Sequence, residues 1–368
     1  MKKVLYICSE AAPGMIPYAA GIIIAASLSK KLDVYAVTVD DGRLSYRQYL
    51  TSDKVVFLTA PSGRIARIIN KIYPYRLYRA VKKTCRQQQI DCIHLLTGDF
   101  TCCRIIPKLK TLGEVFYTVH DLEPHEQYYA GLRERLFEKW ITRRTRHIIN
   151  SVNNLVTNSR FQYEKLKKSF ISKCIFYHSF PALINDMVLS GNDVCPEISD
   201  IDGYILFFGY IQKYKGVEYL YDAYMRNAGI RQKHKLVIAG NGVIYFPHQD
   251  NPDVIFINRY IKDEEIKMLF TKAACVVYPY ISATQSGVLT IAFRFGTPVL
   301  ASDIPYFSEA SDPNCCLYFK SADVQNLSSK LEELLTRCDL NAMKSAQHNF
   351  FNSKLSNEVI MQSIESIY

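Results

Sequence analysis

Short runs of apolar and β-branched residues alternate along this chain with longer stretches in which apolar residues recur at helical spacing. Such alternation predicts strands and helices that follow one another in sequence, as in α/β folds built on parallel sheets. Strands are expected at 3–8, 33–39, 54–59, 91–96, 114–120, 154–159, 203–209, 234–240, 253–258, 274–280 and 297–302. Helices are expected at 18–31, 64–88, 101–112, 131–150, 160–170, 215–228, 262–272, 286–295, 323–337 and 340–367.

The 368 residues are too many for one ordinary core, so two domains are expected. We place them at 1–185 and 203–339. The segment between them, 186–202, has little periodicity and many turn-forming residues, which predicts a linker. The final helix, within 340–368, can pack back on the first domain. The predicted fold class is α/β, with two Rossmann-like parallel-sheet domains facing across a cleft.

Charge is unevenly distributed along the chain. Residues 1–180 hold 29 Lys and Arg against 14 Asp and Glu, whereas the remainder holds 16 against 21. Much of the excess lies in 64–83 and 133–147, which mix cations with apolar residues at helical spacing. This pattern is typical of helices on an anionic membrane surface, and also of solvated helices whose apolar side faces the core. No nucleic-acid-binding motif accompanies it, so a nucleic-acid partner is not expected.

The eleven cysteines form no Cys-x-x-Cys pair, and several lie in apolar, strand-like runs. Buried, reduced thiols are the simplest interpretation and indicate a reducing compartment. No signal peptide precedes the first predicted strand, and the longest apolar run is about half of the ~20 residues that a membrane span needs. We therefore expect a cytoplasmic location, with peripheral association at the inner face of the cell membrane.

In doubly wound sheets, ligands bind beyond the carboxyl ends of the strands, so the loops after the strands hold the candidate site. The loop "YISATQSGVLTI" (280–291) leads into a helix that opens on the small residues Gln285, Ser286 and Gly287. The free N–H groups of a first helical turn attract anions, and small residues let a phosphate approach them. This loop is therefore predicted to bind phosphate.

A second loop, "FFGYIQKYKG" (207–216), places Lys215 at a predicted helix start. Its ammonium would neutralise a diphosphate, and Gln212 and Lys213 offer further donors. The alternative is a surface lysine beside a turn glycine. In "IAGNG", Gly240 and Gly242 either let a ligand approach the backbone or form a tight turn.

The loop "FYTVHDLEPH" (116–125) follows a predicted strand of the first domain. His120 would emerge at the carboxyl end of that strand, where a neutral imidazole can bond a substrate hydroxyl. Asp121 is a nearby carboxylate, whereas Glu123 more simply shapes the loop. A structural role is the alternative for His120 and the preferred interpretation for His125.

The first predicted strand is followed by a loop of small residues, "CSEAAPGM", in which a substrate can approach the backbone at Gly14. The sequence has neither a G-x-G-x-x-G fingerprint nor a G-x-x-x-x-G-K-[ST] loop there. It also has no zinc-spaced set of Cys and His and no serine elbow.

Taken together, these loops resemble those of the glycosyltransferase family 4 enzymes of GT-B fold. The resemblance runs over most of the chain, through "KVLYICSEAAPGM", "TVHDLEPH", "VTNSRFQYEKL", "FFGYIQKYKG", "KLVIAGNG" and "QSGVLTIAFRFGTPVLASDIP". It rests on the order and spacing of the motifs. It implies transfer, with retention, from a nucleotide-diphosphate sugar, without a bound metal or other cofactor.

The resemblance also implies roles for individual residues. His120 matches the histidine near the transferred sugar, and Lys215 matches the diphosphate-binding lysine; these are the predicted catalytic residues. Gly14 matches the glycine-rich N-terminal loop and, with Asp121, is assigned to the acceptor side. The predicted donor-binding residues are Gln212, Lys213, Gly240, Gly242, Tyr260, Gln285, Ser286 and Gly287.

Two departures from the family pattern concern the donor site. Gln212 stands where many members carry an arginine. Many members also carry two glutamates around the diphosphate loop, at positions that here hold Ala283 or Ser282, and Ile291. Related members with a Gln-Ser-Gly loop also lack the second glutamate.

The sequence therefore predicts a glycosyltransferase that adds a sugar to a glycan or polyprenyl-linked acceptor in bacterial surface polysaccharide biosynthesis, such as capsule or lipopolysaccharide. The acceptor would lie in the basic N-terminal domain, and the nucleotide sugar mainly in the C-terminal domain. Two alternatives stay open: a non-catalytic GT-B partner or scaffold protein, and another GT-B enzyme such as a sugar-nucleotide epimerase.

Overall fold

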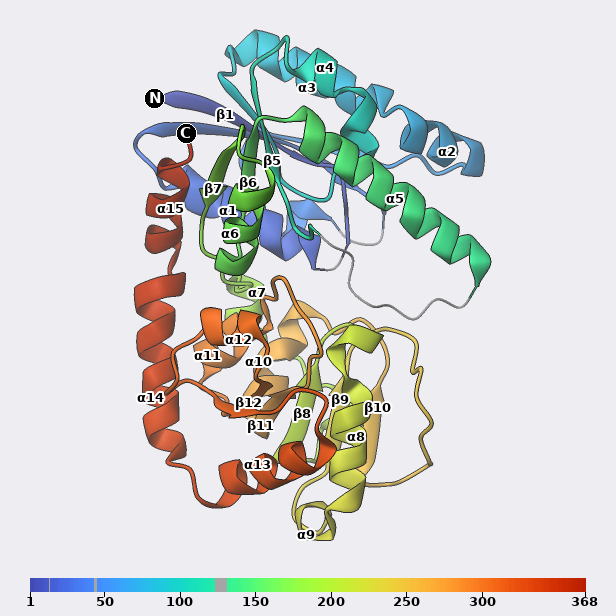
Figure 1. Cartoon of the computed structure of the whole chain (residues 1–368), viewed down its shortest axis with the longest axis vertical. Helices are drawn as coiled ribbons and strands as arrows, with labels where there is room; N and C mark the ends of the chain where they lie inside the picture. Colours follow the sequence, from blue (N-terminus) through green and yellow to red (C-terminus); the bar gives the residue numbers. More distant parts are fainter. Residues whose placement is uncertain (13, 43–44, 123–130) are drawn as a thin grey trace. The chain divides into compact units, whose positions relative to one another are not determined.

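The computed structural model describes residues 1–12, 14–42, 45–122 and 131–368 (Figure 1). It divides into two units. Unit 1 comprises the described residues of 1–182 together with Ser356–Tyr368, and unit 2 is Leu183–Leu355. Each unit holds its own parallel sheet, so the predicted pair of parallel-sheet α/β domains is confirmed.

Unit 1 is built on a seven-stranded parallel sheet with the order β3-β2-β1-β4-β5-β6-β7. Its central strands are buried and read as nearly continuous apolar runs, as expected of strands covered on both faces. The strands are β1 Lys2–Cys8, β2 Leu32–Asp40, β3 Val55–Thr59, β4 Cys92–Leu95, β5 Glu114–Thr118, β6 Asn154–Thr157 and β7 Cys174–Tyr177. The helices are α1 Met15–Ser27, α2 Arg64–Ile72, α3 Tyr75–Gln88, α4 Ile106–Leu109, α5 Leu132–Ser151, α6 Arg160–Ser169 and α15 Asn357–Glu365, with 3-10 turns η1 Tyr46–Gln48 and η2 Phe100–Arg104.

Unit 2 is built on a six-stranded parallel sheet with the order β10-β9-β8-β11-β12-β13. The strands are β8 Tyr204–Phe208, β9 Leu236–Ala239, β10 Val254–Ile257, β11 Ala273–Tyr278, β12 Val299–Ser302 and β13 Leu317–Phe319. The helices are α7 Asp186–Ser190, α8 Val217–Arg226, α9 Ala228–Arg231, α10 Asp263–Thr271, α11 Val288–Phe295, α12 Pro305–Glu309, α13 Val324–Thr336 and α14 Leu340–Phe350, with 3-10 turns η3 Pro196–Ile198 and η4 Lys213–Lys215.

Both sheets reverse their strand order next to their first strand. In unit 1 the reversal lies between β1 and β4, and in unit 2 it lies between β8 and β11. The connections run to opposite sides at such a point, so the loops that leave the carboxyl ends of the two strands diverge and leave room for a ligand. The fold therefore indicates a candidate ligand site at each of these two positions.

Several predicted helices differ from the observed ones. The helix predicted at 64–88 is two helices, because Pro74 has no N–H group and cannot continue α2. The helix predicted at 101–112 is η2 followed by the single turn α4. The helix predicted from Ser286 begins at Val288. Two strands were not predicted, β7 and β13, which lie at the edges of their sheets.

The expected linker at 186–202 also differs from the structure. It contains α7 and η3 and belongs to unit 2, where α7 packs against α10. Asn185 fixes the start of α7: its Oδ1 accepts a hydrogen bond from Val188 N at 2.8 Å, and its Nδ2 donates to Asp263 Oδ2 at 2.7 Å. Periodicity missed this segment because α7 has only five residues.

The predicted final helix is interrupted by a π-helical turn at Phe351–Leu355. Before the turn, α14 belongs to unit 2; after it, α15 belongs to unit 1 and packs against α1. Glu365 of α15 accepts hydrogen bonds from Ser29 Oγ at 2.6 Å and from Lys31 Nζ at 2.8 Å. The C-terminal segment thus contributes to both units.

Candidate functional site

The loops after β8 and β11 meet where the strand order of unit 2 reverses. Ile281 N donates a hydrogen bond to the Tyr214 carbonyl oxygen at 2.8 Å, which ties the loop after β11 to the loop that carries Lys215. Tyr306 Oη donates to the Ser286 carbonyl oxygen at 2.6 Å and holds the other end of the loop after β11. A Cβ added at Gly209 would lie 2.9 Å from Lys215 Nζ and 4.0 Å from Cγ1 of Val288, the first residue of α11. The two predicted phosphate-binding features therefore lie together in the structure.

Lys215 is buried, with 8% of its surface exposed. Its Nζ lies 5.2 Å from the centroid of the Tyr280 ring. No carboxylate of the described residues forms an ion pair with this ammonium, and burial lowers the pKa of Lys215. An ammonium that is buried without a counter-charge costs free energy, which an anionic ligand would recover.

The N-terminus of α11 adds a second positive feature at the same place. Gly287 is its N-cap residue, and no side chain in the described part of the chain caps it. The N–H groups of the first turn are therefore open to a ligand, and the helix dipole favours a negative charge there.

Burial raises the pKa of Tyr280, with the neighbouring Ser286 side chain opposing part of the rise, so the phenol stays protonated.

Gly240 and Gly242 hold the loop after β9 against the loop after β8. Their φ values are +142° and +150°, and an added Cβ would lie 2.0 Å from the Gly209 carbonyl oxygen and 2.4 Å from the Ile211 carbonyl oxygen, respectively. Ile211 N also donates a hydrogen bond to the Asn241 carbonyl oxygen at 2.8 Å. Contact between two loops thus explains both glycines, whether or not a ligand also approaches them.

Three other predicted donor-binding residues lie in the segments that follow β8 and β10. Gln212 and Lys213 are half-buried, and the Gln212 carbonyl oxygen accepts a hydrogen bond from Lys215 N at 3.0 Å. Tyr260 follows β10 and is 38% exposed. Its neighbour Arg259 is held by the protein, because it bonds Glu265 at 2.8 Å and Glu197 at 2.9 Å.

His120 follows β5 in unit 1 and is buried. Its Nε2 donates a hydrogen bond to the Leu96 carbonyl oxygen at 2.9 Å, and its ring packs edge-to-face on Tyr18 with centroids 5.0 Å apart. Burial lowers the pKa of His120, with the Leu96 carbonyl and Asp121 opposing the change, so the imidazole is neutral near pH 7. The structure thus gives His120 the structural contacts that the alternative interpretation expected; a role toward substrate stays a prediction.

The loop after His120 is positioned by Gln162, which the sequence analysis did not single out. Its Nε2 donates to the Val119 carbonyl oxygen at 2.7 Å, and its Oε1 accepts from Leu122 N at 2.8 Å. Asp121 lies in this loop and is exposed, whereas the predicted Glu123 and His125 lie outside the described residues. The only sequence signal for Gln162 was its place in the first turn of α6 after the N-cap Ser159.

Two carboxylates that the sequence analysis missed lie where the strand order of unit 1 reverses. Asp99 accepts hydrogen bonds from Ser9 N and Thr97 N, each at 2.8 Å, and so joins the loops after β1 and β4. The Glu10 carboxylate lies against Gly98, where an added Cβ would be 2.6 Å from Oε1. Burial, together with the Asp99 carboxylate, raises the pKa of Glu10 to about 8. The sequence signal for Glu10 was its place two residues after the first strand, in a loop at the carboxyl end of the sheet.

The Glu10→Gln variant is expected to be more stable than wild type at pH 9 and equally stable at pH 4. The folded-state pKa of Glu10 is raised, so its protonated form is favoured in the fold and the chain loses stability as pH rises from about 4.5 to about 8. Glutamine removes this loss, which we expect to be at least ~1 kcal/mol. Urea unfolding at the two pH values measures the difference in free energy of unfolding between the variant and wild type. The same difference at pH 4 and pH 9 would contradict a buried, protonated Glu10.

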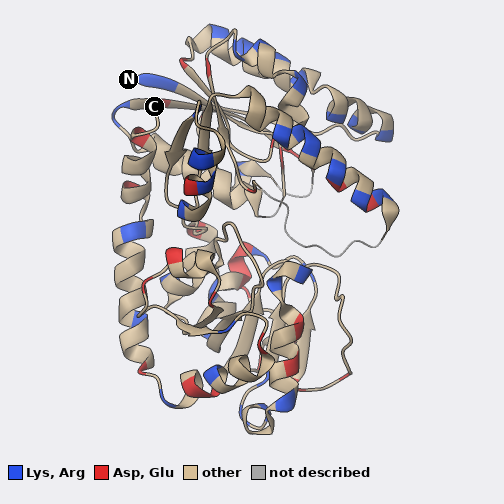
Figure 2. Ribbon diagram, in the orientation of Figure 1, with Lys and Arg blue, Asp and Glu red and all other residues tan. Residues whose placement is uncertain are grey.

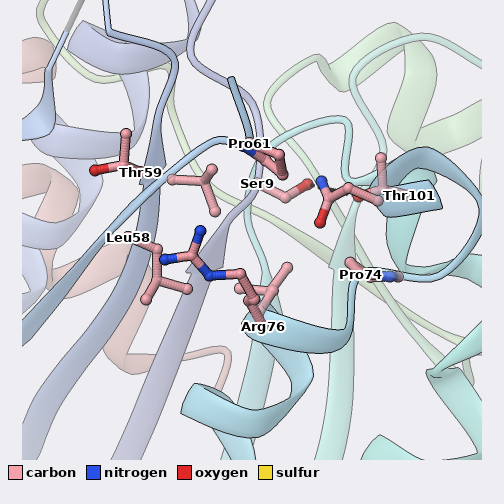
Figure 3. A pocket seen from close by; sticks show the side chains of 10 residues that line it. Ser9, Leu58, Thr59, Pro61, Pro74, Arg76 and Thr101 are labelled. Carbon is pink, nitrogen blue, oxygen red and sulfur yellow. Dashed lines mark hydrogen bonds between the residues drawn. The ribbon is translucent and has the colours of Figure 1, made fainter. Parts of the chain in front are cut away.

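A small pocket lies at the same edge of the unit 1 sheet (Figure 3). Ser9 and Thr101 line one side, and Leu58, Thr59 and Arg76 line another. Its volume is about 20 Å³, which holds about one water molecule and is too small for a sugar.

Gly14 is the N-cap residue of α1, with φ −81°. An added Cβ would meet no atom within 4 Å, so no described neighbour requires a glycine there. Open space in front of this backbone is compatible with the predicted approach of a substrate.

Comparison with known proteins follows the same division of the chain. Residues 24–174 match the model of "Glycosyltransferase Family 4", and residues 202–337 match that of "Glycosyl transferases group 1". The first match covers β2 to β6 of the unit 1 sheet, and the second covers all six strands of the unit 2 sheet. The chain belongs to glycosyltransferase family 4.

This family 4 member is 26% identical, over 247 residues, to a GDP-mannose:glycolipid 4-beta-D-mannosyltransferase of Xanthomonas campestris pv. campestris. The aligned segment covers 62% of this chain and only 63% of that relative. Among solved structures, Anabaena HepE in complex with UDP and glucose has a TM-score of 0.69 at 15% identity, covering 100% of this chain and 99% of that one. Sucrose-phosphate synthase from Thermosynechococcus elongatus has a TM-score of 0.69 at 16% identity, covering 100% and 98%. The structural likeness confirms the GT-B type of fold.

The described residues contain no group of three or more His, Cys, Asp or Glu side chains suited to a metal ion. The expectation of a metal-independent protein stays a prediction.

Proposed function

We propose that this protein is an active glycosyltransferase whose unit 2 binds the diphosphate of a nucleotide-diphosphate sugar. The observation that carries the proposal is the buried Lys215 ammonium, which has no carboxylate partner in the described structure and lies beside the uncapped start of α11. Family membership supports it, and the glycolipid mannosyltransferase relative names one donor of this class, GDP-mannose. Gln212, Lys213, Gly240, Gly242 and Tyr260 are proposed to contact the rest of the donor.

The proposed catalytic effect is electrostatic. Negative charge grows on the diphosphate as the bond to the sugar breaks, and groups that already face that charge stabilise the transition state more than the ground state. Lys215 and the first N–H groups of α11 would supply this stabilisation without any protein group having to ionise. His120 is proposed to contact the transferred sugar through its neutral ring. Retention of the anomeric configuration stays a prediction from the family resemblance.

The proposed acceptor is a glycan or polyprenyl-linked glycan of a bacterial surface polysaccharide, bound by unit 1. The glycolipid named as acceptor of the Xanthomonas relative supports this class. The excess of Lys and Arg in residues 1–180 supports contact between the acceptor domain and an anionic membrane surface. None of the described helices is long and apolar enough to cross a membrane.

The Gly14→Val variant is expected to keep its stability within about 1 kcal/mol, because the added side chain meets open space. It should lose roughly 10-fold in kcat/KM for the acceptor if the acceptor approaches this backbone. Steady-state kinetics with varied acceptor measure the loss, and KM for the donor is the control. Unchanged acceptor kinetics would remove Gly14 from the site.

Activity itself is tested by incubating the full chain with GDP-mannose, UDP-glucose and other nucleotide sugars, with and without lipid-linked glycan acceptors. Acceptor-dependent release of the nucleoside diphosphate is the expected result. Isomerised nucleotide sugar without acceptor would indicate an epimerase instead. No turnover with any donor, from protein that binds no nucleotide, would favour the non-catalytic partner.

A further inference from the structure

A pocket of about 310 Å³ lies in unit 1 where the end of α2, η2 and α5 meet. Arg104, Arg143 and His147 line it with exposed side chains, and Trp140 forms part of its wall. No carboxylate is among the described residues that line it. The pocket therefore presents cationic groups and one aromatic ring to solvent.

Arg144 also lines this pocket, with a buried side chain. Its guanidinium donates hydrogen bonds to the carbonyl oxygens of Lys71 and Ile72 at the end of α2, the latter at 3.1 Å. It also lies 4.4 Å from the centroid of the Trp140 ring. These contacts fix α2 to α5 and occupy Arg144. Arg104 and Arg143, by contrast, form no ion pair within the described structure, so their charges face solvent.

The adjoining helix α2 has an apolar stripe that the fold leaves in water. None of its residues is buried, and Ile65, Ile68 and Ile69 are 75%, 52% and 59% exposed. Ile72, at the end of the stripe, lines the pocket. Exposed apolar area of this kind on a helix marks a surface that contacts something else.

Cations surround the stripe. Residues 64–88 contain eight Lys and Arg and no Asp or Glu, and Figure 2 shows Lys and Arg along α2, α3 and α5. Lys71 of α2 lies 4.3 Å from the centroid of the Phe137 ring on α5, so the basic and apolar groups of the two helices adjoin. The surface combines positive charge with apolar side chains over a short distance.

We propose that this surface binds an anionic phospholipid bilayer, with a lipid phosphate in the Arg104–Arg143 pocket and the α2 isoleucines entering the acyl region. A soluble anion would leave the isoleucines in water, and a neutral bilayer would leave the arginines without counter-charges. An anionic bilayer satisfies both requirements, and Trp140 stands at the boundary where such rings are common. The inference gives the membrane contact in the proposed function a site and a chemistry.

Trp140 is the single tryptophan of the chain, so its fluorescence reports on the pocket directly. The full chain is mixed with vesicles of phosphatidylcholine alone, or of phosphatidylcholine with phosphatidylglycerol, each made with brominated acyl chains. We expect quenching of Trp140 with the anionic vesicles only, and weaker binding as salt is raised. Further arms use inorganic phosphate, and neutral vesicles doped with a polyprenyl phosphate.

Two double variants test the two halves of the surface. R104Q/R143Q should weaken binding to anionic vesicles by roughly 30-fold, from about 1 kcal/mol for each charge. I65S/I68S should weaken it by at least ~10-fold through lost apolar burial. The matched controls R226Q/K233Q, in unit 2, and L28S/I171S change exposed residues outside the pocket, the stripe and the surrounding cations, and should stay within ~3-fold.

Several outcomes overturn the proposal. These are equal binding to neutral vesicles, equal losses in pocket variants and controls, and vesicle binding without quenching of Trp140. A response to inorganic phosphate that anionic vesicles do not exceed would assign the pocket to a soluble anion. A response to polyprenyl phosphate but not to phosphatidylglycerol would assign it to the lipid carrier of the acceptor. Nucleotide binding is measured on the same samples, so failure of this inference is distinguishable from failure of the proposed transferase.

Discussion

The Lys215→Met variant is expected to bind nucleoside diphosphates roughly 100-fold more weakly than wild type while being more stable in the absence of ligand. Wild type holds the ammonium buried, without a carboxylate partner among the described residues. Methionine fills similar space without the charge, so the apo protein should gain about 1 kcal/mol and unfold about 2–4 °C higher. Loss of the same charge removes the main attraction for a diphosphate.

Thermal unfolding with and without UDP, GDP or ADP measures both effects in one experiment. The wild type should unfold at a higher temperature with its nucleotide, and the variant should respond much less at the same nucleotide concentration. Lys215→Arg is the matched control, since it keeps the charge. A lower unfolding temperature for apo Lys215→Met, with an unchanged nucleotide response, would mean that Lys215 is structural.

The pH dependence of nucleotide binding follows from the Lys215 ammonium. Burial lowers the pKa of Lys215, so its charge is lost at a lower pH than that of an ordinary lysine. Nucleotide affinity should therefore fall as pH rises through the lowered pKa, whereas the stability of the apo protein should not fall on this account. The folded state binds this proton more weakly than the unfolded chain does, so its loss favours folding.

The Ser286→Asp variant is the second substitution with a large expected effect. A carboxylate directly before the Gly287 N-cap would interact favourably with the start of α11 and with the nearby ammonium, stabilising the apo protein by roughly 0.3–1 kcal/mol. The same carboxylate would repel a diphosphate and should weaken nucleotide binding by roughly 100-fold. The substitution thus imitates the ligand and excludes it.

Ser286→Ala is the control for the lost hydroxyl and should stay within ~5-fold of wild type. Equilibrium titration of the three proteins with the preferred nucleoside diphosphate gives the affinities, and urea unfolding gives the stabilities. Equal affinities of Ser286→Asp and wild type would show that the diphosphate does not lie at α11.

The alternation of strand and helix patterns predicted both sheets, because strands buried on two faces are apolar along their whole length. The edge strands β7 and β13 escaped, since their residues are mostly only partly buried and their signal is short. The break at Pro74 is encoded in the sequence, because a proline cannot continue a helix. The helix α7 could not be predicted from periodicity, because it has only five residues and its start is held by the contact of Asn185 with Asp263, far away in sequence.

The positions of the candidate residues in the fold could be predicted from the sequence, whereas their environments could not. The loop that carries Lys215 and the loop that leads into α11 lie together, since the carboxyl ends of neighbouring parallel strands share one edge of a sheet. The burial of Lys215 without a carboxylate partner among the described residues depends on groups from two loops, which spacing does not specify. Likewise, the raised pKa of Glu10 arises from packing against Gly98 and from Asp99, nearly ninety positions away in sequence.

The central claim is that unit 2 binds a nucleotide-diphosphate sugar at Lys215 and the start of α11. Titration calorimetry of the full chain with UDP, GDP, ADP and their sugar conjugates, with EDTA present, tests it most directly. We expect selective binding of one nucleotide series by wild type and its loss in Lys215→Met. Folded protein that binds none of these nucleotides, or that binds one equally well without Lys215, would show that unit 2 holds no such donor site.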